Sequence, residues 1–205
     1  MSDAFIIANG EFSASASQIE EMRRSSCLIA VDGGIDHCLH NNLHPHLLVG
    51  DFDSVSFTSL SAFSAVPQVK LLRDKDKTDL EVAVEKAAEM TPGPLRIFGA
   101  LGKRTDHYLF NLYLLARYPG RMTMESLKER VFVVRGQHKM ACQQGQTISL
   151  LPIDGPVRGI TTRGLKWELH EAAFDKSWMS ISNVCLAREV IISAKEGDLL
   201  CCLQS

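Results

Sequence analysis

The first 118 residues of this chain alternate short apolar runs with amphipathic stretches of helical period. We expect strands at residues 4–8, 28–31, 47–49, 69–72 and 95–98, and helices at 17–24, 35–41, 56–65, 78–90 and 106–118. Because a strand–helix–strand repeat joins parallel strands through crossover helices, this order predicts an α/β domain with a parallel sheet covered on both faces.

The pattern changes after about residue 120, where β-type runs between turn signals replace the helical period. We expect strands at 131–134, 147–151, 157–161, 165–169, 179–182, 189–193 and 199–203, with turns at 154–156, 163–164 and 196–198. Short strands at such spacing are typical of an antiparallel sandwich. The sequence therefore predicts a second, all-β domain, with a boundary between residues 120 and 137.

Composition excludes several classes of protein. The 205 residues carry a formal net charge of −2, which gives no general attraction to nucleic acid or to an anionic membrane. No run approaches the roughly 18 apolar residues of a membrane span, and residues 1–10 lack a secretory signal. The six cysteines form no CxxC pair, which favours buried free thiols in a reducing compartment. We therefore expect a cytoplasmic protein.

Charged residues and glycines directly follow four of the predicted strands. The segments are DGG at 32–34, GDFDS at 50–54, RDKDKTD at 73–79 and GALGKRTDH at 99–107. Ligands of open parallel sheets bind outside the carboxyl ends of the strands. Carboxylates gathered at one edge repel each other unless a cation joins them, and Mg²⁺ takes carboxylate and phosphate oxygens together. Basic residues in these segments would meet the remaining phosphate charge: Arg73, Lys75, Lys77, Lys103 and Arg104.

Asp51 and Asp53 are the strongest metal candidates. In extended backbone their side chains point the same way, while Phe52 points toward the core. The alternative is a turn held by Asx hydrogen bonds. Asp32 and Asp79 at neighbouring strand ends favour the metal interpretation.

Helix starts supply the phosphate candidates. Gly33 and Gly34 would let the backbone approach a phosphate at a helix N-terminus. Thr78 fits an N-cap, with Glu81 completing a capping box. Arg104 precedes the last helix of the first domain, and His107 at its start is more typical of a structural hydrogen bond than of a catalyst.

Two weaker motifs are set aside. The segment GALGKR at 99–104 has two residues between its glycines, whereas a phosphate-binding Walker loop has four and then Ser or Thr after Lys. His44 and His46 have no further His or Cys at ligand spacing, which argues against zinc.

In this order, the motifs resemble those of the thiamine pyrophosphokinase family. The matching pieces are NG at 9–10, DGG at 32–34, GDFDS at 50–54, KDKTDLE at 75–81, GALGKRTDH at 99–107 with Asn111, GLKWEL at 164–169 and SISN at 180–183. The resemblance implies a Rossmann-like catalytic domain at 1–125 that binds ATP and Mg²⁺, a thiamine-binding β-sandwich domain at 131–205, and a homodimer with thiamine between subunits.

The resemblance also implies roles for individual residues. Together with the acidic edge, it leads us to expect Mg²⁺ ligands at Asp51, Asp53 and Asp79 and catalytic roles for Asp53, Asp79 and Arg104. Whether Asp53 or Asp79 accepts the hydroxyl proton of thiamine stays open. The resemblance implies ATP or phosphate contacts at Asp32, Gly33, Gly34, Lys75, Lys77, Thr78, Asp106, His107 and Asn111. Trp167 would stack on thiamine, with Ser182 and Asn183 nearby, and cation–π attraction gives that role a mechanism. In a strand, however, Trp167 would share a face with Leu165 and Leu169, so a core role remains open.

Two rival functions remain at this stage. One is pyrophosphoryl transfer to another small alcohol, such as a hydroxymethyl-pterin, and the motifs at 164–169 and 180–183 argue against it. The other is a non-catalytic thiamine or nucleotide sensor, which would not need the full acidic set.

Overall fold

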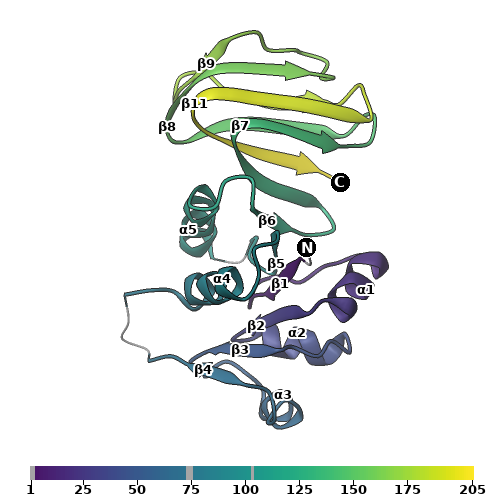
Figure 1. Ribbon diagram of the computed structural model, residues 1–205, viewed down its shortest axis with the longest axis vertical. Helices are drawn as coiled ribbons and strands as arrows, with labels where there is room; N and C mark the ends of the chain where they lie inside the picture. Colours follow the sequence, from purple (N-terminus) through teal and green to yellow (C-terminus); the bar gives the residue numbers. More distant parts are fainter. Residues whose placement is uncertain (1–2, 73–75, 103) are drawn as a thin grey trace. The chain divides into compact units, whose positions relative to one another are not determined.

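The computed structural model describes residues 3–72, 76–102 and 104–205, and its fold is mixed α/β with a large sheet (Figure 1). The chain divides into two compact units. The first comprises Met1–Tyr108 and Met124–Leu127, and the second comprises Leu109–Thr123 and Lys128–Ser205. No helix among the described residues is long and apolar enough to cross a membrane.

The first unit contains five parallel strands in the order β5-β1-β2-β3-β4. They are β1 (Ala4–Ile7), β2 (Cys27–Val31), β3 (Leu47–Gly50), β4 (Gln68–Lys70) and β5 (Leu95–Phe98). The predicted parallel pairing of these segments is confirmed. β1 and β2 are buried along their whole length, as expected of strands packed on both faces.

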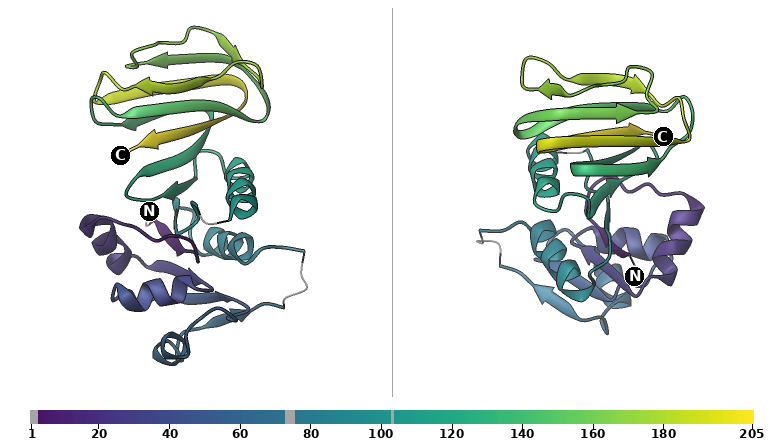
Figure 2. Two further views of the ribbon diagram at one scale, coloured as in Figure 1. Left: turned by 180° about the vertical axis from the view of Figure 1, so that it is seen from behind. Right: turned by 45° about the horizontal axis from the view of Figure 1, so that its top comes forward.

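Helices cover both faces of these strands, and a further helix, α5 (Thr105–Ala116), continues from the first unit into the second. The other helices are α1 (Ala16–Arg24), α2 (Gly34–His40), α3 (Phe57–Ala62) and α4 (Asp79–Met90). Figures 1 and 2 show α1 and α2 on one face and α4 on the other. Met22 of α1 and Ile35 of α2 pack in one core cluster with Leu28 and Ala30, which are two residues apart on β2. This period of two is what places alternate strand residues on the same face.

The second unit is mostly antiparallel. Its strands β7 (Glu129–Ala141), β8 (Thr147–Arg163), β10 (Ser180–Val184) and β11 (Glu189–Gln204) are ordered β10-β8-β11-β7, and β9 (Ala172–Phe174) pairs with β8. Its buried core includes Phe132, Ile148, Phe174, Ile192 and Cys201. A further short strand, β6 (Met122–Glu125), falls in a segment for which the sequence predicts no strand.

The predicted turns at 154–156 and 196–198 are wrong. Residues 147–163 form one strand, and residues 189–204 form another. Asp154, Gly155 and Gly197 have positive φ angles of 61°, 120° and 84°. The register between β8 and β11 shifts between Glu196 and Asp198. Left-handed residues here bend and bulge continuing strands instead of ending them.

The predicted strand at 165–169 is also wrong. Only Leu165 forms an isolated bridge, with Cys185, and the rest of the segment is a loop. The loop has no strand alternation, so Trp167 does not share a face with Leu165. Leu165 is 3% exposed and Trp167 is 55% exposed, which excludes a core role for the tryptophan.

All six cysteines are free thiols, as predicted. Four are buried, and Cys142 and Cys202 are half-buried. Burial raises the pKa of the Cys38 thiol to about 12. The thiolate is the nucleophilic form, so this thiol is inert at neutral pH.

Candidate functional site

The carboxyl ends of β1, β2 and β5 are joined by close backbone packing at glycines. The Gly10 amide donates to the carbonyl oxygen of Gly99 at 2.6 Å. A Cβ at Gly10 would lie 2.1 Å from that same oxygen, and a Cβ at Gly34 would lie 2.0 Å from the Ile7 carbonyl oxygen. No side chain fits in that space, so glycine is required for these strand ends to meet at one edge.

Asp32 lies at the end of β2, next to the end of β3. Its amide donates to the Val49 carbonyl oxygen at 3.0 Å. A Cβ at Gly50 would lie only 1.9 Å from Asp32 Oδ1, and Gly50 has a φ of 148°. The Asp32 carboxylate therefore packs directly on the backbone that leads into Asp51, as its place in the predicted acidic edge requires.

The loop that carries Asp51 and Asp53 is an Asx turn, so the predicted extended backbone is wrong and the alternative holds. The Asp53 amide donates to Asp51 Oδ1 at 3.0 Å, and Phe52 between them has a φ of 63°. Phe52 packs against the core cluster, as predicted. Asn9 Nδ2 donates to Ser54 Oγ at 3.3 Å, which ties this loop to the end of β1. A hydrogen bond from one N–H to a carboxylate oxygen does not exclude a cation from that carboxylate, so the turn is compatible with cation binding.

The donor chemistry of this edge fits Mg²⁺, although the described residues do not form a complete cage. Within residues 3–72, 76–102 and 104–205, no three His, Cys, Asp or Glu side chains lie close enough together to hold an ion. Mg²⁺ is commonly bound through one or two carboxylates, with water and substrate phosphates supplying its other ligands. Asp51 and Asp53, with Asp32 packed at the neighbouring strand end, offer that kind of site.

The start of α4 carries three of the predicted residues. Thr78 is the N-cap, and its Oγ1 accepts the Glu81 amide at 3.2 Å, which confirms the predicted cap. Asp79 is the first residue of the helix. Lys77 Nζ forms an exposed ion pair with Glu85, at 2.7 and 2.8 Å from its two carboxylate oxygens. Lys75, together with Arg73 and Lys103, lies outside the described residues.

The start of α5 carries an exposed bidentate ion pair. Arg104 Nη2 lies 2.7 Å from Asp106 Oδ2, and Nε donates to Oδ1 at 3.2 Å. The Arg104 hydrogen bond lowers the pKa of Asp106 to about 2, with help from the His107 amide. His107 thus contributes through its backbone at the helix start. Asn111 lies one turn later on α5 and is buried.

Trp167, Ser182 and Asn183 belong to the second unit and differ sharply in exposure. Trp167 is 55% exposed, and the Lys166 ammonium lies 4.6 Å from the centroid of its ring. Ser182 is exposed, has a φ of 58°, and its amide donates to Ser149 Oγ at 3.0 Å. Asn183 is only 1% exposed. Trp167 and Ser182 are therefore accessible to a ligand, and the Asn183 side chain is not.

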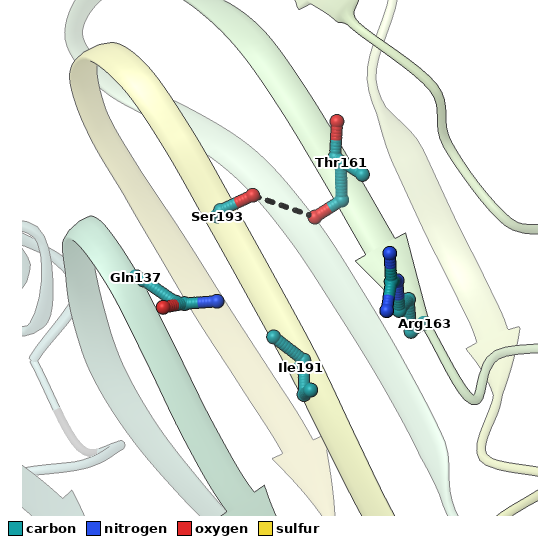
Figure 3. A pocket seen from close by; sticks show the side chains of 5 residues that line it. All are labelled: Gln137, Thr161, Arg163, Ile191 and Ser193. Atoms are coloured by element: carbon teal, nitrogen blue, oxygen red, sulfur yellow. Dashed lines mark hydrogen bonds between the residues drawn. The ribbon is translucent and has the colours of Figure 1, made fainter.

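A pocket lies on the sheet of the second unit, and no sequence motif predicts it. Its volume is about 200 Å³, and five side chains from β7, β8 and β11 line it: Gln137, Thr161, Arg163, Ile191 and Ser193 (Figure 3). Ser193 Oγ donates to the Thr161 carbonyl oxygen at 3.2 Å, so that hydroxyl is already used inside the sheet. No sequence motif joins residues that meet only through strand pairing.

Two further residues escaped prediction as members of the site. Ser54 anchors the acidic loop to Asn9, and its only sequence signal is its place at the end of the GDFDS segment. Lys166 covers part of the Trp167 ring, and its signal is adjacency to Trp167. Neither contact follows from residue type alone.

The chain is an α/β protein of two units with an acidic, glycine-lined strand edge, and two successive segments of it match the two domains of one kinase family. Residues 19–126 match the family described as "Thiamin pyrophosphokinase, catalytic domain", and residues 136–199 match "Thiamin pyrophosphokinase, vitamin B1 binding domain". The chain belongs to the thiamin pyrophosphokinase family.

Relatives with this name span most of the chain. Thiamine pyrophosphokinase of Bacillus subtilis is 29% identical over 176 residues, covering 80% of this chain and 78% of the relative. Thiamine pyrophosphokinase 2 of Arabidopsis thaliana is 28% identical, covering 79% and 66%. The crystal structure of thiamin pyrophosphokinase from Geobacillus thermodenitrificans is 26% identical with a TM-score of 0.87, covering 99% and 97%.

Proposed function

We propose that this chain transfers the pyrophosphoryl group of ATP to the hydroxyl of thiamine, giving thiamine pyrophosphate and AMP. The observation that carries the proposal is the match of both family domains, in order, over residues 19–126 and 136–199. The predicted acidic edge falls inside the first match, and the Trp167 loop falls inside the second.

In this proposal, residues 1–125 form a Rossmann-like catalytic domain and residues 131–205 form a thiamine-binding β-sandwich. Asp51, Asp53 and Asp79 would hold Mg²⁺. Because no three such side chains lie close enough together among the described residues, these carboxylates would have to draw together around the ion. When bound, the ion supplies positive charge to the phosphate oxygens of ATP. The packing of Asp32 against Gly50 supports this arrangement, because it fixes one carboxylate beside the Asp51 loop.

The cationic residues of the edge would bind the phosphates. Arg104, Lys75 and Lys77 spread the negative charge that develops during transfer, and Gly33, Gly34, Thr78, Asp106, His107 and Asn111 complete the ATP contacts. Lys77 must then leave Glu85, and Arg104 must leave Asp106. Both pairs are exposed, and exposed ion pairs contribute little stability, so they are easily replaced.

The reaction itself needs orientation and charge stabilisation. The thiamine hydroxyl attacks the β-phosphorus in line, AMP leaves, and the hydroxyl proton passes to Asp53 or Asp79. Trp167 would stack on thiamine, with Ser182 and Asn183 close by. The family resemblance further leads us to propose a cytoplasmic homodimer with its active site at the subunit interface.

The proposal is tested by separating the nucleotides after incubation with ATP, Mg²⁺ and thiamine. We expect AMP and thiamine pyrophosphate in equal amounts. ADP as the nucleotide product would instead indicate transfer of a single phosphate. A substrate panel that includes a hydroxymethyl-pterin tests the rival alcohol, and thiamine binding without AMP release would favour a sensor.

Replacing Trp167 with alanine is expected to raise the thiamine KM by about 5-fold to 150-fold, because stacking of an aromatic ring on a bound ring contributes roughly 1–3 kcal/mol. The ATP KM should stay unchanged. Steady-state kinetics with each substrate varied in turn measures both values.

The matched control is Trp178→Ala. Trp178 is 53% exposed and packs edge-on against Phe174, with ring centroids 4.9 Å apart. We expect this variant to keep the wild-type thiamine KM. An equal rise in both variants would contradict a specific role for Trp167.

A further inference from the structure

The loop that carries Trp167 is held by β10 and by the segment that follows it. It lies between the end of β8 at Arg163 and the start of β9 at Ala172, without regular structure of its own. The Lys166 amide donates to the Val184 carbonyl oxygen at 2.8 Å, and the Leu186 amide donates to the Gly164 carbonyl oxygen at 2.8 Å. Buried backbone groups need such partners wherever a sheet ladder does not supply them.

At Trp167 the partner is a side chain, Asn183. The Trp167 amide donates to Asn183 Oδ1 at 3.1 Å, and Asn183 Nδ2 donates to the Trp167 carbonyl oxygen at 2.7 Å. Oδ1 also accepts the Val184 amide at 2.8 Å. Two N–H donors to one atom identify it as the oxygen, so the amide orientation is fixed by the network. The Asn183 carboxamide therefore makes the two hydrogen bonds to the Trp167 backbone that a neighbouring strand would otherwise make.

Burial separates the roles of the two residues. Asn183 is 1% exposed, whereas Trp167 is 55% exposed. The Asn183 amide is therefore shielded from water, which strengthens its hydrogen bonds, and it is also shielded from any ligand. The two bonds fix the peptide groups on both sides of the Trp167 Cα, and so limit where the indole ring can lie.

We propose that Asn183 is a positioning residue that acts on thiamine binding only through Trp167, and is not itself a ligand contact. The effect on thiamine binding rests on the proposed function. The positioning of Trp167 by Asn183 does not depend on it. It replaces the direct thiamine contact that the family resemblance implies for Asn183.

The test uses Asn183→Asp in a Trp178→Phe background, where Trp167 is the only tryptophan. Aspartate keeps the side-chain shape and the acceptor for both amides, but it places a carboxylate oxygen against the Trp167 carbonyl oxygen. We expect the steady-state fluorescence anisotropy of Trp167 to fall in the protein without substrate. The thiamine KM should rise about tenfold, the order of effect of one lost buried hydrogen bond, with the ATP KM unchanged.

The double variant with Trp167→Ala separates positioning from direct contact. If Asn183 acts only through Trp167, adding Asn183→Asp to Trp167→Ala leaves the thiamine KM where Trp167→Ala alone puts it. A further rise of about tenfold in the double variant would overturn the proposal, because residues that act independently have additive effects.

The control is Asn41→Asp, the same change at an asparagine whose Nδ2 donates to the His37 carbonyl oxygen at 2.8 Å in the first unit. It should leave both the anisotropy and the thiamine KM unchanged. Anisotropy that is unchanged in Asn183→Asp would refute the proposed positioning of Trp167 by Asn183, whatever the rate of thiamine turnover. Absence of turnover in the wild-type protein, with anisotropy that still falls, would refute only the proposed function.

Discussion

Replacing Asp53 with asparagine is expected to lower kcat by about 100-fold to 1,000-fold, the usual effect of removing one group that stabilises transition-state charge. The amide keeps the shape of the side chain but loses its negative charge. The hydrogen bond that forms the turn uses the backbone amide of Asp53, so the loop to Asp51 is kept. Turnover and the Mg²⁺ concentration for half-maximal rate are measured together, and we expect the Mg²⁺ requirement to rise.

Asp154→Asn is the matched control for this substitution. Asp154 is exposed, lies in β8, and has a φ of 61°, a conformation that asparagine also tolerates. It loses the same charge outside the candidate site and should keep wild-type turnover. Wild-type turnover in Asp53→Asn would remove that residue from the metal and catalytic set.

The second large effect is expected from Gly50→Ala. A Cβ at this position would lie 1.9 Å from Asp32 Oδ1, so the Asp32 carboxylate must move. The φ of 148° also strains any residue with a side chain. We expect a loss of stability of about 2–5 kcal/mol from strain and overpacking together, and a loss of turnover because the acidic edge is displaced. Thermal unfolding and kcat measure the two effects.

Gly155→Ala controls for strain alone. Gly155 has a φ of 120°, and an added Cβ there meets no atom within 4 Å. This variant should lose about 1–3 kcal/mol from backbone strain and keep its turnover. If Gly50→Ala retained full turnover, the contact between Asp32 and Gly50 would have no part in the chemistry.

The first unit could be predicted closely because its signals are local. Apolar runs of strand length alternate with helical periods, and Thr78 followed by Glu81 fixes the start of α4 within one residue. The strand ends then follow from topology, because each parallel strand delivers the next residues to the same edge. Strand order alone therefore predicts that Asp32 and Asp51 lie at the same edge of the sheet, and Asp32 does pack on Gly50, the residue before Asp51.

The second unit was harder because its signals are ambiguous. Gly155 and Gly197 have the conformation that a turn would need, yet both lie inside continuing strands. Whether a left-handed residue closes a hairpin or bulges a strand is decided by pairing with a distant strand. The burial of Asn183 could not be predicted for the same reason, because its hydrogen-bond partners belong to Trp167, sixteen residues earlier in the chain.

The ion pairs of Lys77 and Arg104 have a consequence for how an anion would be recognised. Each cation already has a carboxylate counter-ion in the helix that follows it: Glu85 of α4 for Lys77, and Asp106 of α5 for Arg104. An arriving phosphate therefore displaces one anion with another, and the net Coulomb gain is small in exposed surroundings. In the proposed site, discrimination would therefore depend on the number of contacts, because a polyphosphate would engage both cations and a single carboxylate would engage one.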